Sequence, residues 1–195
     1  MKTSRQKPLT IIETAFSASF NEEATQEELQ DLRDLLLQEL DRGALGIGLA
    51  LDYFSAAIQE AEMRTIFEVA SKRAATIFVH VRRGIDGDPT GLREVIEYAR
   101  EYNASVHICH ISHNAISQLE LFLAEIREAQ ADGLDITTEV LPYNAGSAFI
   151  SAAVFGRDWK TIFNISYADV ELAATGQRFD REMWEEYREE YPESQ

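Results

Sequence analysis

Residues 105–112 read SVHICHIS, a short run in which apolar and polar side chains alternate. Alternation with a period of two residues is typical of a β-strand with two different faces. A helical pattern precedes this run at about 92–102, and another follows it at about 115–131. The stretch therefore predicts a strand flanked by two helices, which is the repeating unit of a parallel α/β sheet.

The same alternation of helix and strand occurs along most of the chain. Helical patterns occupy 25–41, where Thr25 and Glu28 form a capping box, and about 58–73. The predicted strands lie at 44–53, 76–82, 105–112 and 135–143. Because these strands begin about every 30 residues with a helix between them, they predict right-handed βα units in one parallel sheet.

Four such units make half of a (β/α)8 TIM barrel. We expect one α/β domain over residues 1–195, built as a partial barrel of about four to five βα units. In this interpretation 1–24 is a leading segment and 25–143 holds the four units. The remainder, 144–195, begins with a loop of small residues that borders the active site and ends in an acidic helix. We expect it to be a late βα excursion and not a separate domain.

Composition and charge limit the possible partners. The 195 residues include 34 acidic and 18 basic side chains, for a formal net charge of −16. A surface this negative disfavours nucleic acid and anionic membranes. The longest apolar stretch, 149–155, is far shorter than the roughly 20 residues of a membrane span, and 1–10 lacks the apolar core of a secretory signal. We expect a cytoplasmic protein whose single cysteine, Cys109, forms no internal disulfide.

Three of the four histidines lie within 107–113, and the fourth, His80, lies 30 residues before His110. In α/β barrels the functional side chains gather at the carboxyl ends of the strands. His80 and His110 fall near the ends of neighbouring predicted strands. Their spacing therefore predicts two imidazoles side by side, close enough to share one metal ion.

The other residues of this stretch are expected to have different roles. His107 lies three positions before His110, so strand alternation predicts that it points to the other face, toward the helices or the core. Cys109 shares that face and is expected to be a small buried hydrophobic residue. His113 falls in the loop after the strand, where it either reaches the mouth of the site or meets solvent.

Four motifs occur in this order along the chain: GALGIGLALDY, FVHVR, VHICHIS and ITTEVLPYNAGS. Together they resemble the middle of a metal-dependent amidohydrolase of the D-aminoacylase group, and most of all its N-acyl-D-glutamate deacylase branch. The resemblance runs from about Thr25 to Pro192. It implies a (β/α)8 barrel in which histidines at the ends of the fifth and sixth strands bind one or two zinc ions. His80 and His110 match those two positions.

The resemblance also implies an activity, the hydrolysis of N-acyl-D-amino acids such as N-acyl-D-glutamate to a carboxylate and a free D-amino acid. Tyr143 matches a tyrosine that polarises the scissile carbonyl or holds this small-molecule substrate. Ser147 lies in the matching small-residue loop and is a candidate substrate contact. Ser112 stands at a substrate-binding position where the family often has a lysine for the substrate carboxylate.

Other parts of the family's site have no counterpart in this sequence: the His-x-His pair of the first strand, the Cys or Glu metal ligand, and the Asp that serves as general base. We therefore expect a fragment that is inactive alone and that self-associates through its open barrel edges. Two alternatives stay open. One is a noncatalytic half-barrel that acts as a binding or scaffold protein, and the other is an amidohydrolase that acts on another, cyclic amide.

Overall fold

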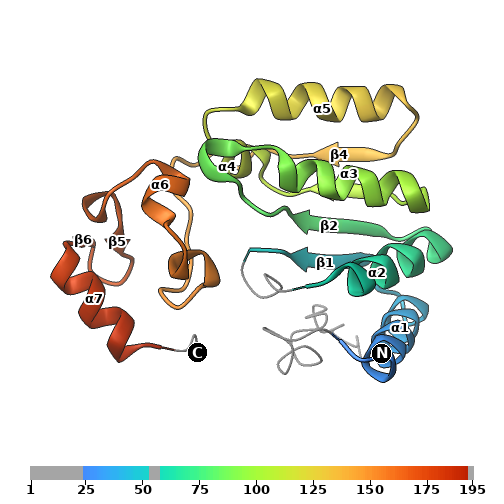
Figure 1. The fold of residues 1–195 in the computed structure, drawn as a ribbon, viewed down its shortest axis with the longest axis horizontal. Helices are drawn as coiled ribbons and strands as arrows, with labels where there is room; N and C mark the ends of the chain where they lie inside the picture. The colour runs from blue at the N-terminus through green and yellow to red at the C-terminus, as the bar shows by residue number, and fades with distance from the viewer. Residues whose placement is uncertain (1–23, 53–57, 193–195) are drawn as a thin grey trace, which may run out of the picture.

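The computed structural model of the protein describes residues 24–52 and 58–192. The predicted leading segment, 1–24, lies outside these residues except for its last position, and so does the end of the first predicted strand at Tyr53. Four parallel strands pair in the order β1-β2-β3-β4 and alternate with helices (Figure 1). This arrangement confirms the predicted α/β class and the order of the strands.

Between Gln26 and Thr138, the helices begin and end close to the predicted positions, whereas the strands are shorter than predicted. The elements of this region are α1 Gln26–Asp41, β1 Gly46–Ala50, α2 Glu60–Arg73, β2 Thr76–His80, η1 Ile85–Gly87, α3 Thr90–Tyr102, β3 Val106–Ile108, α4 Ile111–Ala115, α5 Leu119–Ala131 and β4 Ile136–Thr138. The predicted capping box of Thr25 and Glu28 starts α1. The helix predicted at about 115–131 is present as α5 but begins later, at Leu119, because Ile116, with φ +49°, separates it from the short α4.

One face of the sheet packs against the helices. Ile77 and Val79 of β2 are fully buried there, and Val106 of β3 continues the same layer. These residues join apolar side chains of α2, α3 and α5 in the main core. The other face carries Phe78, whose exposed fraction is 42%, next to His107. In a closed barrel this would be the inner face, and we call it the inner face below.

Residues 144–192 lie beyond the carboxyl ends of the strands (Figure 1). This segment contains η2 Ala153–Gly156, α6 Trp159–Phe163, η3 Tyr167–Asp169, β5 Glu171–Leu172, β6 Gln177–Arg178 and α7 Arg181–Glu190. It has its own hydrophobic cluster around Trp159, Phe179 and Trp184. Because β5 and β6 pair antiparallel with each other and form a separate sheet, the prediction of a late βα excursion is wrong. Among the helices of the described ranges, none has the length and apolar character needed to cross a bilayer.

Candidate metal centre

His80 is the last residue of β2, and its ring meets that of His110 at the carboxyl end of the sheet. Nδ1 of His80 lies 3.0 Å from Nε2 of His110. The ring centroids are 4.6 Å apart and the planes cross at 67°. His80 lies two residues after Phe78 on β2, so both side chains point to the inner face, where the exposed fraction of His80 is only 5%. The spacing of 30 residues does bring the two rings together, while their role as metal ligands stays a prediction.

His110 reaches this position through a turn and not through a strand. Strand β3 ends at Ile108, and His110 has a left-handed backbone, with φ +37°, immediately before α4. A residue other than glycine held in this region costs on the order of 1–3 kcal/mol, so its surroundings must stabilise it. The carboxylate of Glu139, which follows β4, accepts a hydrogen bond from the backbone N–H of His110. This bond holds the turn that directs the His110 side chain toward His80.

The prediction that His107 faces the helices is wrong. Its neighbour in the register is Phe78 on the inner face, and the two ring centroids are 5.5 Å apart. Nε2 of His107 lies 2.7 Å from the carboxylate of Glu139. The buried face of β3 belongs to Val106, so alternation places His107 opposite. The turn at His110 breaks the alternation on which the prediction depended.

His113 and Cys109 lie beside the pair. The ring centroid of His113 is 5.9 Å from that of His110, and the His113 carbonyl accepts a hydrogen bond of 3.1 Å from Nε of Arg83. Cys109 is half-buried rather than fully buried. Burial, together with the charge of Glu139, raises the pKa of its thiol to about 11. The raised pKa disfavours the thiolate, which is the form that binds metal ions.

Burial keeps both imidazoles of the pair neutral. It lowers the pKa of His80 to about 2, and the positive charge of Arg83 acts in the same direction. The pKa of His110 is also lowered, again mainly by burial. A metal ion binds the neutral form of histidine, through the lone pair of an unprotonated ring nitrogen. Each ring of the pair is therefore neutral, which is the charge state that a metal requires.

A buried carboxylate lies on the other side of His80. Asp52, which is 3% exposed, has Oδ2 at 3.9 Å from Nε2 of His80. Asp52 accepts hydrogen bonds from the backbone N–H of Arg83, at 2.9 Å, and from Nη1 of Arg157, at 3.2 Å. Burial raises the pKa of Asp52, although both donors favour its charged form. Three buried or half-buried groups, two imidazoles and one carboxylate, thus meet at this end of the sheet.

The sequence did not single out Asp52 or Arg157. Asp52 is the first charged residue after the apolar run of β1, so the rule that found His80, a polar residue at the carboxyl end of a strand, could have found it too. Arg157 lies 105 residues further along the chain. No local pattern in the sequence connects it with this site.

The predicted substrate residues lie at the same end of the sheet. Ser112 is in α4, with Oγ 3.4 Å from Nδ1 of His113. Tyr143 and Ser147 follow β4 and are exposed, Tyr143 by 69%. A Cβ placed on Gly146 would lie 3.5 Å from Cδ2 of His113, so this loop lies against the His113 ring. The roles of these residues toward a substrate stay predictions.

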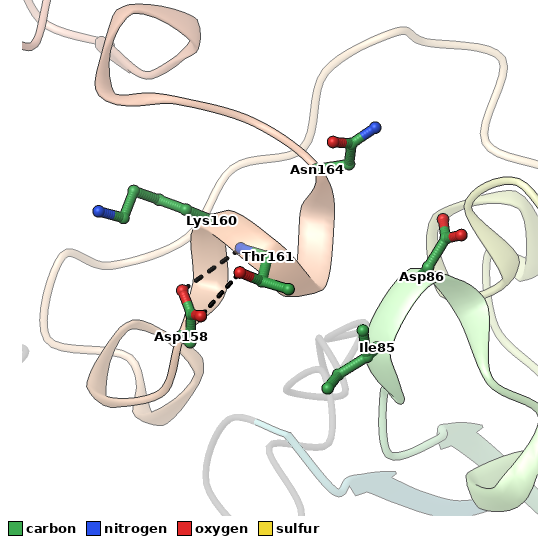
Figure 2. Close-up of a pocket in the computed structure, with 6 residues that line it drawn as sticks. All are labelled: Ile85, Asp86, Asp158, Lys160, Thr161 and Asn164. Carbon is green, nitrogen blue, oxygen red and sulfur yellow. Dashed lines mark hydrogen bonds between the residues drawn. The ribbon is translucent and has the colours of Figure 1, made fainter.

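Hollows open where the sheet meets the C-terminal segment. One of about 600 Å³ lies between η1 and α6 (Figure 2) and is lined by Ile85, Asp86, Asp158, Lys160, Thr161 and Asn164. There Asp158 accepts a hydrogen bond of 2.7 Å from the Thr161 hydroxyl and caps α6. Another of about 420 Å³ is lined by Asp52, Arg82, Arg83, Gly84, Thr90, Gly91, Glu94 and Arg157. The second hollow adjoins the histidine pair through Asp52.

The pair fits two positions of a tetrahedral zinc site. Nitrogen ligands bound at about 2.0–2.1 Å in tetrahedral geometry are roughly 3.3–3.4 Å apart. Nδ1 of His80 and Nε2 of His110 are 3.0 Å apart, so a small rotation of the rings would accommodate the ion. Within the described ranges, no group of three or more His, Cys, Asp or Glu side chains is placed to hold a metal. Because catalytic zinc uses three protein ligands, these residues supply part of a site.

Over 128 residues the chain is 27% identical to N-acyl-D-glutamate deacylase of Alcaligenes xylosoxydans xylosoxydans, a match that covers 63% of this chain and 26% of that relative. The crystal structure of N-acyl-D-glutamate deacylase from Bordetella bronchiseptica contains zinc and a phosphonate inhibitor that mimics the tetrahedral intermediate. It matches with a TM-score of 0.57 at 27% identity, over 63% of this chain and 27% of that chain.

A crystal structure of D-aminoacylase, which defines a subset of amidohydrolases, has a TM-score of 0.61 at 24% identity over 70% of this chain and 30% of that chain. This likeness shows the fold alone. No protein-family model matches the chain.

The four parallel strands and their helices thus correspond to part of an amidohydrolase barrel. More particularly, the chain is homologous to N-acyl-D-glutamate deacylase and D-aminoacylase over about 63% of its length. It spans about a quarter of the length of these relatives, 26% of the Alcaligenes deacylase and 27% of the Bordetella deacylase.

Proposed function

We propose that this chain supplies the two-histidine part of a metal-dependent amidohydrolase site that hydrolyses the amide bond of N-acyl-D-amino acids, with N-acyl-D-glutamate as the reference substrate. The observation that carries the proposal is the pair itself. Nδ1 of His80 and Nε2 of His110 converge at the carboxyl ends of β2 and β3, in a sheet that matches a zinc-containing N-acyl-D-glutamate deacylase.

His80 and His110 would hold the ion through these two atoms, and their burial keeps them neutral for this purpose. When bound, zinc would supply a Lewis acid that polarises the amide carbonyl and activates water. Tyr143 and Ser147 would contact the substrate from the loop after β4, and Ser112 from α4. Hydrolysis would yield a carboxylate and a free D-amino acid.

A second candidate is a noncatalytic half-barrel that binds a ligand or another protein. It is favoured by one observation, that the described residues place two metal ligands together and not three. A two-ligand site holds zinc weakly and leaves a general base to be supplied from elsewhere. Both candidates therefore contain the histidine pair, and they differ in whether the chain hydrolyses a substrate.

Zinc binding and hydrolysis, measured on the same preparations, test both candidates. Zinc affinity is measured by competition with a chromophoric chelator for the native chain and for the variants His80→Ala, His110→Ala and His107→Ala. His107 is the matched control, because it is a histidine on the inner face of the same sheet, next to Phe78 and not in the pair. Hydrolysis is measured with N-acetyl-D-glutamate, with its L-enantiomer and with a cyclic amide.

We expect zinc affinity to fall at least about tenfold in H80A and H110A and to change little in H107A. Hydrolysis of the D-substrate that depends on both histidines would establish the amidohydrolase and exclude the noncatalytic candidate. Zinc binding through the pair without turnover would favour the noncatalytic candidate. Zinc binding that is indifferent to His80 and His110 would overturn the proposal.

A further inference from the structure

A buried acid faces the side of the His80 ring that points away from His110. Oδ2 of Asp52 lies 3.9 Å from Nε2 of His80, and both residues are at most 5% exposed. The other ring nitrogen of His80, Nδ1, faces Nε2 of His110 at 3.0 Å. The ring is therefore oriented between a carboxylate and a second imidazole, one on each nitrogen.

Asp52 is held in place from two directions. The backbone N–H of Arg83 donates to Oδ2 at 2.9 Å, and Nη1 of Arg157 donates to Oδ1 at 3.2 Å. Nη2 of Arg157 also donates to the carbonyl of Arg83, at 3.0 Å. Arg157 belongs to the segment that follows the sheet, so this clamp joins that segment to the histidine pair through Asp52.

The geometry restricts where the proton of neutral His80 lies. A distance of 3.9 Å is too long for a hydrogen bond, but short enough for a strong electrostatic interaction in a buried site. With two donors on its oxygens, Asp52 presents negative charge to Nε2. A proton on Nε2 is attracted by this charge, whereas a lone pair on Nε2 would be repelled. The proton on Nε2 leaves the lone pair on Nδ1, which in the metal-free protein accepts the 3.0 Å hydrogen bond from Nε2–H of His110.

We propose that Asp52 is a positioning residue that holds His80 as the Nε2–H tautomer, with Nδ1 as its metal-binding atom, and that Arg157 holds Asp52 for this purpose. Histidines that bind metals commonly direct their second nitrogen at a carboxylate, which fixes the tautomer and the orientation of the ring. The role toward the metal rests on the proposed function. The tautomer does not, because it exists in the metal-free protein.

The first measurement is the tautomer itself. Long-range ¹H–¹⁵N correlation spectra of the metal-free native chain, labelled on histidine nitrogens, distinguish a protonated Nε2 from a protonated Nδ1. We expect His80 to be protonated on Nε2. In Asp52→Asn, which removes the charge but keeps the size, we expect a mixture of the two tautomers. We also expect zinc affinity in D52N to fall about 10–100-fold, the usual effect of removing such a carboxylate.

Matched variants separate positioning from general destabilisation. Glu62 is another buried acid, 2% exposed and placed at the start of α2, so E62Q should destabilise the fold and leave the His80 signals unchanged. Arg157→Gln should shift the tautomer in the same direction as D52N, but less. Arg100→Gln is its control, because Arg100 has similar side-chain exposure, 43% against 46%, and pairs with Glu97 of α3 and with Asp132 at the end of α5.

Each outcome decides the inference. Protonated Nε2 in the native chain, lost in D52N and weakened in R157Q, supports it. If D52N does not fold, the tautomer of His80 in the native chain and in R157Q still tests the inference. Protonated Nδ1 in the native chain would overturn it and would show that Nδ1–H donates to Nε2 of His110 instead. If the native chain binds no zinc, the proposed function fails, while the tautomer still shows whether Asp52 positions His80.

Discussion

Nε2 of His107 lies 2.7 Å from a carboxylate oxygen of Glu139. The same carboxylate accepts a hydrogen bond from the backbone N–H of His110. One side chain after β4 thus connects the inner face of β3 with the turn that directs His110. Partial burial raises the pKa of Glu139, but the bonds from His110 and His107 outweigh this and hold the pKa below its usual range. At neutral pH Glu139 is therefore a charged acceptor.

We expect Glu139→Gln to disturb the turn at His110, and with it zinc binding, while it changes the free energy of unfolding only slightly. The side chain of Glu139 is 45% exposed, so its contact with His107 contributes less than about 1 kcal/mol to the free energy of unfolding. Zinc affinity should fall about tenfold, because the carboxylate orients a ligand. Urea denaturation and chelator competition measure the two effects. An equal loss of affinity in E128Q, which changes an exposed acid of α5, would contradict the prediction.

Glu68 of α2 connects two helices, because it accepts hydrogen bonds from Arg33 of α1, at 2.7 Å, and from Lys72. These bonds lower the pKa of Glu68 to about 2. A carboxyl whose folded pKa is below its unfolded value, about 4.3, stabilises the fold above that value. This stabilisation is lost as the pH falls from about 4.3 toward 2.

We expect Glu68→Gln to lower the free energy of unfolding by about 0.5–1 kcal/mol at pH 7, less than the pKa shift alone implies, because solvent screens a pair that is about a third exposed. At pH 2 and below, where Glu68 becomes protonated in the folded chain as well, the variant and the native chain should have nearly equal stability. Urea denaturation at both pH values measures this. E97Q, which changes an exposed acid of α3 paired with Arg100, should show no such pH-dependent difference. A deficit in E68Q that persists at pH 2 would exclude the ion pair as its cause.

The fold and the histidine pair could be predicted because both depend on spacing. Strands that recur about every 30 residues predict neighbouring parallel strands, and the register confirms it, since His107 pairs with Phe78 across β3 and β2. The same interval separates His80 from His110. The capping box of α1 is equally local, because Thr25 and Glu28 are three residues apart.

What could not be predicted depends on where a strand stops or on contacts between distant residues. Strand alternation counted back from His110 put His107 on the wrong face, because β3 already ends at Ile108. The turn that follows is held by the hydrogen bond from the His110 backbone N–H to the distant Glu139. The contact of Arg157 with Asp52 spans 105 residues and has no periodic signal. The antiparallel pairing of β5 with β6 likewise has no counterpart in the βα repeat.

Gly46 and Gly48 lie on the same strand, β1, but in different surroundings. A Cβ on Gly46 would lie 2.3 Å from the carbonyl oxygen of Thr76 and 2.8 Å from the Phe78 ring, whereas a Cβ on Gly48 would meet open space. Gly46→Ala must therefore separate β1 from β2, and we expect it to cost about 1–3 kcal/mol. Gly48→Ala should be neutral or stabilise by up to about 1 kcal/mol, because it restricts the unfolded chain. Urea denaturation of both variants measures this, and equal effects would contradict the close contact at Gly46.

Trp184 of α7 is the centre of a hydrophobic cluster that is distinct from the main core. Its ring centroid lies 4.8 Å from that of Trp159 and 5.5 Å from that of Phe179, and it is 6% exposed. Truncating such a residue to alanine costs about 3–5 kcal/mol. Because the cluster is separate, we expect W184A to open β5, β6 and α7 while the parallel sheet stays folded.

Hydrogen exchange followed by mass spectrometry measures this difference. In W184A, amides of β6 and α7 should exchange faster than in the native chain, and amides of β2 and β3 should keep their protection. Phe122→Ala is the matched control, because Phe122 is buried in the main core, 1% exposed, and its loss should expose the amides of the sheet. Equal loss of protection in β2 in both variants would show that the two clusters fold as one cooperative unit.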